Sequence, residues 1–401
     1  MSLIRLMSYS LRMTPDIQLL INCCKVKPTA SDIEHIRSHL TQLENKQFSK
    51  IVTLAHNHGI FPLFYLALQT HASDLLTSES LTELKQQNMI VVMNDMRMTT
   101  ELIRIMRLLE ENGIDALVIK GPTLTQLAYE DIGLRQFGDL DVLIDERDAY
   151  TAGKVMSENG HKPEIPIKYL QNHTYLKVAK DFSLVSELGS VLTELHWRLF
   201  EKKFNIYTPE RSKDEFQNVK INDFSIKTLP TELLLVYLCL HGSKHAWERI
   251  IWICDIDRLL RSSIIDWEKA IAIAEESHSK RSFYLGLNLC CSLLRTPLPD
   301  AINRRMGKCD ITELIALTLT KLNGKEATRN EFQNNKKTFF YQSKLYDSKI
   351  DKIYFCLNTF FGVSTSDCQT LLLPGKLSFL YVFLRPLLLL YRYMKRVVIQ
   401  T

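Results

Sequence analysis

The sequence lacks the cysteine patterns that are typical of zinc-binding proteins and of disulfide-stabilised proteins. Its nine cysteines include no CxxC pair, and Cys23–Cys24 and Cys290–Cys291 are adjacent pairs within apolar stretches of helical spacing. This usage argues against a zinc site and against a disulfide framework. We therefore expect core cysteines, a reducing compartment and a cytoplasmic protein.

Long hydrophobic runs are also missing. The first sixteen residues contain no extended apolar core, so we expect no signal peptide. The most apolar stretch, residues 376–401, is interrupted by Arg385, Pro386 and Arg392, and its runs are too short to span a bilayer. We expect residues 377–399 to pack on a helical domain and not to anchor the chain in a membrane. Peripheral contact of this basic segment with a membrane surface is the alternative.

Basic residues form no dense stripe along the chain. The formal net charge of +5 over 401 residues suits phosphate-bearing ligands, but no dense basic stripe accompanies it, so nucleic acid is not favoured as a partner. Hydrophobic residues make up 46% and charged residues 24%, which is typical of a globular protein. The length predicts two or three domains.

The periodicity of apolar residues changes twice and predicts an α+β protein. Residues 1–112 carry helical spacing, and residues 113–228 alternate short strand-like runs with helices. Residues 229–401 are helical again, with a polar linker near 321–350. Within the middle part, we expect residues 173–180, 181–189 and 190–199 to be strands. The expected architecture is a small mixed sheet with helices, flanked by N-terminal and C-terminal helical regions.

One predicted strand, "RQFGDLDVLID" at 135–145, contains two carboxylates. Side chains two apart share a face of a strand, so Asp139 and Asp141 lie together while Leu140 and Val142 face the core. Two like charges this close disfavour each other's ionisation unless a cation neutralises them. Mg²⁺ prefers such hard oxygen ligands, so the pair predicts a divalent metal site, against the alternative of a solvated strand end.

Two further features suit phosphoryl transfer at such a site. Gly121 lies in a turn between a strand and a helix, where backbone N–H groups favour anions, and Lys120 precedes it. Glu194 in "LTELHW" is a third carboxylate on a later predicted strand, where His196 shares its face. A phosphate-binding turn, a DxD and a third acid are typical of two-metal phosphoryl transfer. An ordinary cross-strand charge pair of Glu194 with Arg198 is the alternative.

The segment "IKGPTLTQLAYEDIGLRQFGDLDVLID" resembles the active-site segment of the DNA polymerase beta-like nucleotidyltransferase superfamily. More narrowly, the chain resembles a bacterial family of uncharacterised nucleotidyltransferases often found with polysaccharide biosynthesis genes, through "AHNHGIFPLFY", "ELHWRL" and "YLCLHGSKHAWERIIWICDIDRLL". The resemblance implies a nucleotidyltransferase sheet, Mg²⁺ or Mn²⁺ as cofactor and an NTP as substrate. It implies transfer of a nucleoside monophosphate to a hydroxyl or phosphate acceptor (a small molecule, a sugar or a protein) with release of pyrophosphate.

The same resemblance assigns residues to roles. It implies that Asp139, Asp141 and Glu194 are the catalytic metal ligands. The nucleotide phosphates would be held by Lys120, Gly121, Thr123 and Arg135. One departure from the family pattern concerns the turn, where proline replaces the usual serine at position 122 and has no N–H to offer a phosphate.

Three histidines have open roles. His196 either orients Glu194 or fills the sheet edge. His241 and His245 share a helix face at a spacing that also suits zinc, but the glutamate of an HExxH motif is absent. Contact with nucleotide or acceptor and a structural hydrogen-bonded role are the alternatives for these two.

Two rival functions come from other classes. A catalytically silent protein could keep the fold and sense nucleotide, although three retained acids argue against it. A toxin–antitoxin type nucleotidyltransferase would act on RNA or a partner protein, and the lack of a basic patch disfavours RNA. The sequence identifies neither the base of the NTP nor the acceptor.

Overall fold

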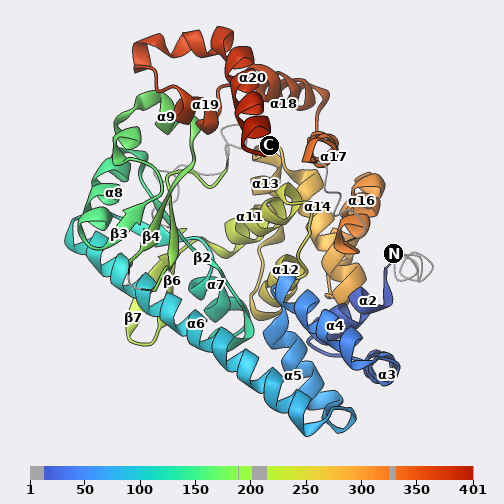
Figure 1. The fold of residues 1–401 in the computed structure, drawn as a ribbon. Coiled ribbons are helices and arrows are strands. Elements are labelled where there is room, and N and C mark those ends of the chain that lie inside the picture. The colour runs from blue at the N-terminus through green and yellow to red at the C-terminus, as the bar shows by residue number, and fades with distance from the viewer. Residues whose placement is uncertain (1–12, 188, 201–214, 325–330, 401) are drawn as a thin grey trace. The chain divides into compact units, whose positions relative to one another are not determined.

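The chain divides into two compact units (Figure 1). The computed structural model describes residues 13–187, 189–200, 215–324 and 331–400, so most of the segment on which the signal-peptide expectation rests, residues 1–12, lies outside it. Unit 1 comprises Met1–Ile103, Val118–Gly138 and Glu215–Asp347, and unit 2 comprises Arg104–Leu117, Asp139–Asp214 and Ser348–Thr401. Each unit combines three separate stretches of the chain, whereas the domains expected from the sequence are the continuous ranges 1–112, 113–228 and 229–401. Those domain ranges stay a prediction.

Unit 1 is mainly helical. Its N-terminal part contains α2 (Pro15–Cys24), α3 (Ala30–Thr41), α4 (Asn45–Asn57), α5 (Phe61–His71), η1 (Ser73–Leu75), α7 (Pro122–Ala128) and η2 (Ile132–Leu134). Its C-terminal part contains α11 (Thr231–Lys244), α12 (Ile251–Ser262), α13 (Trp267–Glu276), α14 (Lys280–Leu289), η6 (Cys290–Leu294), α15 (Asp300–Gly307), α16 (Thr312–Leu322) and α17 (Glu331–Ser343). The 34-residue helix α6 (Ser78–Glu111) continues from unit 1 into unit 2 and ends before Gly113, whose φ is +71°. This end agrees with the sequence-based prediction.

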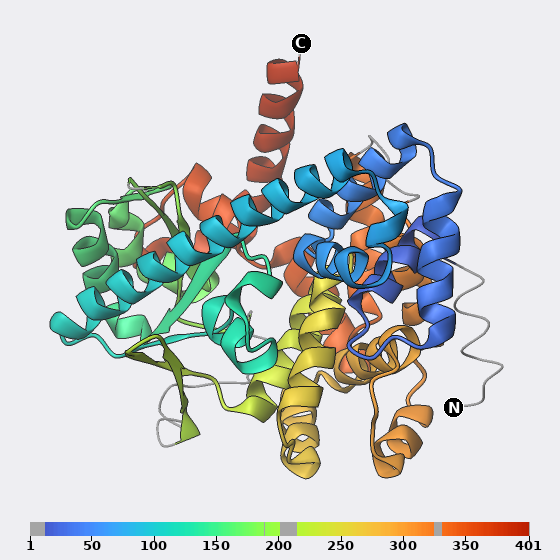
Figure 2. The same ribbon diagram turned by 90° about the horizontal axis from the view of Figure 1, so that it is seen from below.

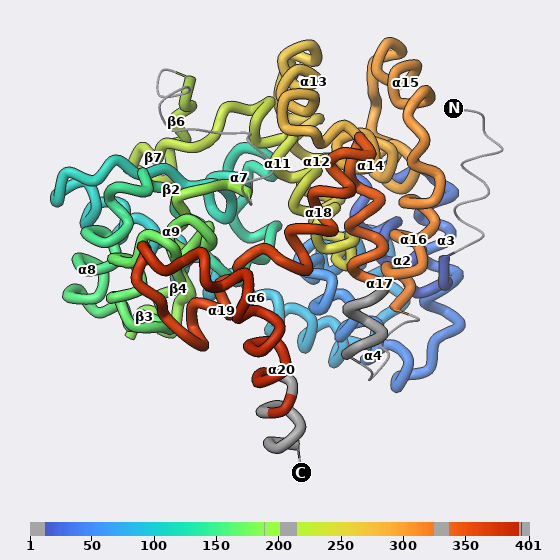
Figure 3. Tube along the Cα trace, turned by 90° about the horizontal axis from the view of Figure 1, so that it is seen from above, coloured from blue at the N-terminus to red at the C-terminus, as the bar shows by residue number. Residues whose placement is uncertain are grey.

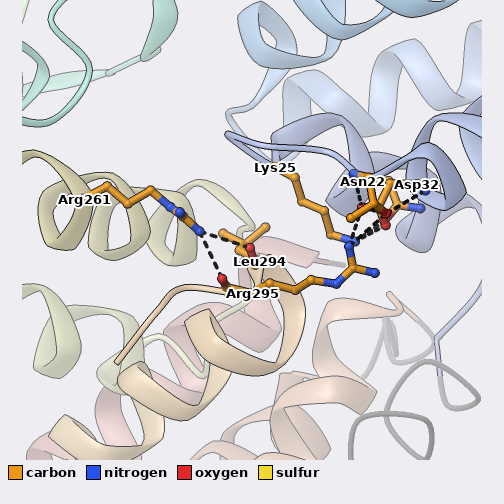
Figure 4. Close-up of polar contacts among 7 residues, drawn as sticks. Asn22, Lys25, Asp32, Arg261, Leu294 and Arg295 are labelled. Atoms are coloured by element: carbon orange, nitrogen blue, oxygen red, sulfur yellow. Dashed lines mark hydrogen bonds and ion pairs between the residues drawn. The ribbon is translucent and has the colours of Figure 1, made fainter. Parts of the chain in front are cut away.

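A buried polar network joins the N-terminal helices of unit 1 to its C-terminal part (Figure 4). Thr29 and Asp32 form a capping box at the start of α3, and Lys25 donates to Asp32 at 2.7 Å. Arg295 also pairs with Asp32, from a left-handed backbone position that ends η6. Burial raises the pKa of Asp32, but hydrogen bonds from Lys25 and Thr29 outweigh it and hold the pKa well below its usual range. The network therefore keeps this buried carboxylate charged.

Gly242 in α11 lies against a fully buried tryptophan. A Cβ on Gly242 would stand 2.4 Å from an atom of the Trp247 ring, far inside van der Waals contact. Helices α11 and α12, drawn in yellow in Figure 2, pack on each other here. Gly242→Ala is therefore expected to destabilise the protein by about 1–3 kcal/mol through overpacking, even though alanine favours helix. Chemical denaturation of both proteins measures this difference.

The matched control for that substitution is Gly307→Ala at the end of α15. A Cβ there meets no atom within 4 Å, so we expect no loss of stability. Equal stability of the Gly242 and Gly307 variants would contradict the close packing of Trp247.

Asp95 is a carboxylate with no exposed surface on α6. Burial raises its pKa to about 7, and the backbone of Phe137 and the charge of Arg135 offset this only in part. Because the folded-state pKa exceeds the unfolded value, the contribution of Asp95 to stability is complete below about pH 4 and is lost as the pH rises to about 7. The stability of Asp95→Asn relative to wild type should therefore increase as the pH rises from about 4 to about 7, by up to about 1.4 kcal/mol per pH unit. Above pH 7 the difference should stay constant.

Measuring the free energy of unfolding of both proteins from pH 4 to pH 8 checks this prediction. The difference between wild type and variant isolates Asp95 from other titrating groups. A difference that does not change with pH would show that Asp95 remains ionised in the folded protein.

The strands form a mixed sheet. In unit 2, β3 (His161–Pro163), β4 (Asp181–Ser186), β5 (Leu192–His196) and β2 (Asp139–Ile144) lie in that order, with β3–β4 and β4–β5 antiparallel and β5–β2 parallel. In unit 1, β7 (Phe224–Thr228) is antiparallel to β6 (Gln217–Ile221), and its Thr228 pairs in parallel with Val118 of β1 (Ala116–Val118). The expected fold class, α+β with a mixed sheet and helices before and after it, is confirmed.

Two segments differ from the secondary structure expected of them. Residues 173–180 were expected as a strand, but His173–Val178 form helix α9, because the Asn172 side chain accepts from two backbone N–H groups and caps it. The polar stretch 321–350 was expected as a linker, yet it contains α17, where the Tyr341 side chain is buried. Residues 325–330 lie outside the described part of the chain.

Unit 2 is completed by helices. These are η3 (Glu146–Asp148), α8 (Ala149–Glu158), η4 (Ile167–Gln171), α18 (Lys349–Phe361), α19 (Thr365–Thr370), η7 (Gly375–Leu380) and α20 (Tyr381–Gln400). The side chain of Asn172 donates to the Leu373 carbonyl at 2.9 Å, and Figures 1 and 3 show α19 beside α9. The C-terminal segment thus packs within unit 2. Among the described helices, none has the length and apolar character needed to cross a bilayer.

Candidate functional site

Strand β2 places its two aspartates as its alternation predicts. Leu140 and Val142 have no exposed surface, whereas Asp139 and Asp141 lie on the opposite face of the strand. Asp141 is nevertheless 2% exposed, so its carboxylate is buried within unit 2. A carboxylate in such a place requires a positively charged or hydrogen-bonding partner.

The parallel pairing of β2 with β5 supplies partners for Asp141. The register aligns Asp141 with Glu194 and Leu143 with His196. Because side chains alternate in both strands, Glu194 and His196 lie on the face of the sheet that carries Asp141. One ligand atom from each of Asp141, Glu194 and His196 lies within 4.8 Å of the others, and among the described residues they form a group that could hold a metal ion.

His196 lies between the two acids. Its Nε2 is 3.2 Å from the Asp141 Oδ1 and 3.2 Å from the Glu194 Oε2. Burial lowers the pKa of His196, but hydrogen bonds to Asp141 and Glu194 raise it, and the net pKa is above its ordinary value. The two carboxylates thus favour the protonated form of His196, and a bound metal ion would displace that proton.

Glu194 shows the reciprocal effect. The hydrogen bond with His196 lowers the pKa of Glu194, against the opposing effects of burial and of the Asp141 charge. Its side chain is 28% exposed, so it is the more accessible of the two acids. Arg198 instead pairs with Glu146 and donates to the Lys177 carbonyl at 2.9 Å. Arg198 is thus engaged with Glu146, and the partner of Glu194 is His196.

The start of strand β4 and the residue before it add two charges that the sequence analysis missed. Its antiparallel register aligns Asp181 with His196, and the Asp181 Oδ2 is 3.9 Å from the His196 Nδ1. Lys180 pairs with Asp181 and lowers the pKa of Glu194 through its charge. A signal was present in "KDFSLVS", where an aspartate opens a strand of alternating polarity, but only the strand pairing shows which residue it faces.

The donor set fits a divalent cation. Two carboxylates offer the oxygen ligands that Mg²⁺ and Mn²⁺ prefer, and an imidazole nitrogen is a usual additional ligand for Mn²⁺ and other transition metals. Asp139 lies two residues before Asp141 on the same face, paired in register with Leu192. The place of Asp139 therefore allows it to extend the set, and its role as a ligand stays a prediction.

The predicted phosphate turn forms in unit 1. Gly121 has a φ of +72° and precedes α7, a conformation that residues with a side chain rarely adopt. Lys120 is half-buried, whereas Thr123 is fully buried and its hydroxyl donates to the Lys120 carbonyl at 3.4 Å. The turn is present as expected, and its contact with phosphate stays a prediction.

Arg135 has a partner that the sequence did not indicate. It is 5% exposed and pairs through two nitrogens with both oxygens of Asp255 at 2.7 and 2.9 Å. Tyr129 donates to the same carboxylate at 2.8 Å. This buried network fixes the Arg135 guanidinium in unit 1.

His241 and His245 belong to an aromatic cluster of unit 1. Their ring centroids are 5.0 Å apart and lie 5.4 and 5.3 Å from the Trp252 ring. This packing suits the structural role among the alternatives considered for them. Contact with nucleotide or acceptor stays a prediction.

Comparison with known proteins adds a family to this geometry. A family model described as "Uncharacterised nucleotidyltransferase" matches residues 44–295, a range that includes β2, β4 and β5. No curated protein matches the chain. Among solved structures, the chain is similar to an antigenic nucleotidyltransferase-like protein from Paracoccidioides brasiliensis. That likeness has 14% identity, covers 54% of this chain and 96% of the other, and has a TM-score of 0.30.

Proposed function

The chain belongs to the uncharacterised nucleotidyltransferase family, and from that premise we propose a specific reaction for it. The protein transfers a nucleoside monophosphate from an NTP to a hydroxyl or phosphate acceptor and releases pyrophosphate. The observation that carries this proposal is the group Asp141, Glu194 and His196 on two parallel strands, with ligand atoms within 4.8 Å of one another. The nine free cysteines support a cytoplasmic location.

The acids have distinct roles in the proposed reaction. Asp139 and Asp141 would hold Mg²⁺ or Mn²⁺, with Glu194 as the third acidic ligand. The bound cation would offset the negative charge that develops on the phosphate oxygens. Glu194 orients the acceptor hydroxyl and accepts its proton, while the acceptor oxygen bonds to the α-phosphorus and the bond to the leaving pyrophosphate breaks. The greater exposure of Glu194 supports this role.

His196 is a positioning residue in this proposal. Its Nε2 contacts both acids, so it sets the direction of each carboxylate. Asp181 faces its other nitrogen and stabilises the imidazolium. The hydrogen bond from His196 lowers the pKa of Glu194 and so favours its ionised form, which is the form that binds a cation.

The residues that the family resemblance implies for the nucleotide are proposed to bind its phosphates. Lys120 and the backbone at Gly121 bind phosphate oxygens, and Thr123 holds the Lys120 carbonyl in place. Arg135 is proposed to contribute positive charge to phosphate binding, with its guanidinium held in place by Asp255. Because Pro122 offers no N–H, we expect Lys120 to contribute more to phosphate binding than the turn backbone does.

Label transfer tests the proposed reaction. The protein is incubated with each of the four NTPs, labelled in turn on the α- and the γ-phosphate, with Mg²⁺ or Mn²⁺ and host lysate. We expect α-label from at least one NTP in an acceptor and γ-label in pyrophosphate. Transfer of γ-label to an acceptor would show a kinase, and absence of α-transfer with all four NTPs and both metals would contradict the proposal.

A further inference from the structure

The C-terminal helix α20 directs charged side chains inward. Arg385 and Arg392 reach the Asp367 carboxylate at 3.4 and 2.8 Å, and Asp367 itself has no exposed surface. Arg385 also donates to the Thr359 carbonyl of α18 at 2.7 Å. The arginines that interrupt the apolar stretch in the sequence therefore anchor the helix to α18 and α19.

The apolar side chains of α20 point the other way. At positions that recur every three or four residues, they form an exposed stripe of Val382, Phe383, Leu387, Leu390, Tyr391 and Met394. The neighbouring helix α18 exposes a second stripe of Ile350, Ile353, Tyr354, Leu357, Phe360 and Phe361. Both helices thus invert the usual arrangement, in which the apolar face is buried.

This exposure is concentrated in one segment. Among the described residues, sixteen of the twenty-four exposed large apolar side chains lie between residues 350 and 394. Contiguous exposed apolar surface of this kind marks a site of interaction with a protein or a membrane.

Charge distinguishes between these two kinds of partner. Residues 368–401 contain no aspartate or glutamate and five basic residues: Lys376, Arg385, Arg392, Lys395 and Arg396. Asp367 neutralises only part of this charge. Apolar and aromatic side chains combined with an excess of lysine and arginine complement an anionic lipid surface, which attracts basic segments and accepts apolar side chains at its acyl boundary.

We propose that the segment from α18 to α20 binds the surface of an anionic lipid bilayer. The exposed stripes enter the region between headgroups and acyl chains, and the net positive charge of the segment, which includes the exposed Lys376, attracts it to the phosphates. Since no described helix can cross a bilayer, the segment lies along the surface. This develops the alternative of peripheral membrane contact, beside the packing expected for residues 377–399, and it predicts weak binding to a neutral bilayer.

Flotation with vesicles tests this proposal on the full chain. One set of vesicles is phosphatidylcholine, and in the other about a third of the lipid is phosphatidylglycerol. We expect flotation with the anionic vesicles, which decreases as salt is raised, and little flotation with the neutral ones. The variant Phe383→Gln, Leu387→Gln, Leu390→Gln should lower the bound fraction about tenfold or more, because three inserted apolar side chains are lost.

A matched triple variant controls for loss of exposed apolar surface in general. Met89→Gln, Ile90→Gln, Met93→Gln changes three side chains of α6 that are 54%, 67% and 66% exposed, and it should float like wild type. Thermal melting verifies that both variants fold. Equal binding of the α20 variant and wild type, or equal binding to neutral and anionic vesicles, would overturn the proposal. So would a dimer in solution that the α20 variant dissociates while no vesicle binds.

Discussion

Asp141→Asn is expected to lower the rate of nucleotidyl transfer by roughly two to three orders of magnitude or more, while the fold remains intact. The amide keeps the shape of the side chain but removes a negative charge from a position only 2% exposed. Both the proposed cation and the His196 imidazolium then lose a partner. Transfer of α-label in the presence of Mg²⁺ measures the loss, and thermal melting measures the fold.

Two further substitutions sharpen this test. Asp139→Asn is expected to abolish transfer as well, because it is the other proposed ligand on the same face of β2. Asp223→Asn, in the exposed turn between β6 and β7, makes the same chemical change away from the site and should leave the rate unchanged. Wild-type turnover by the Asp141 variant would remove this residue from the metal site.

Glu194→Gln is expected to lower kcat by about a hundredfold or more and to change the affinity for NTP only a few fold. The reason is the proposed division of labour, in which Glu194 serves the acceptor hydroxyl while the nucleotide binds through the aspartate-bound cation and Lys120. Calorimetric titration of NTP into the Glu194 and Asp141 variants separates the two roles. The Asp141 variant should lose both nucleotide affinity and turnover.

The control for Glu194 is Glu158→Gln on α8. That carboxylate is 62% exposed and pairs with the exposed Lys154 at 3.8 Å, so its loss should affect neither binding nor turnover. If the Glu194 and Asp141 variants lost nucleotide affinity equally, Glu194 would have no role specific to the acceptor.

Strand β2 and its aspartates were predictable because their signal is local. The period of two in 139–144 places Leu140 and Val142 on one face and Asp139 and Asp141 on the other, and no distant residue is needed to read it. The end of α6 was predictable for the same reason, since Gly113 follows the last helical turn. Helix α9 was missed because a single cap, Asn172, decides between helix and strand for a short segment.

The partners within the site could not be read in the same way. Whether His196 orients Glu194 or fills the sheet edge depends on the register of β5 against β2, which brings His196 to Asp141 across 55 residues. Arg135 was expected near phosphate because the family resemblance implies it. Its carboxylate partner Asp255 is 120 residues away in the sequence, and no local sequence pattern predicts a pairing over that separation.

The parallel pairing of β2 and β5 also has a consequence for the order in which the protein folds. Antiparallel β4 and β5 are close in the sequence, whereas the β2–β5 ladder closes a loop that contains α8, β3, α9 and β4. Loop-closure entropy makes such long-range pairing slow compared with local helices and hairpins. We therefore expect the contact between Asp141 and Glu194 to form late, after most of the helix content is present. A nascent or partly refolded chain would then resemble the native protein in helicity while it still lacked a site able to bind a metal ion.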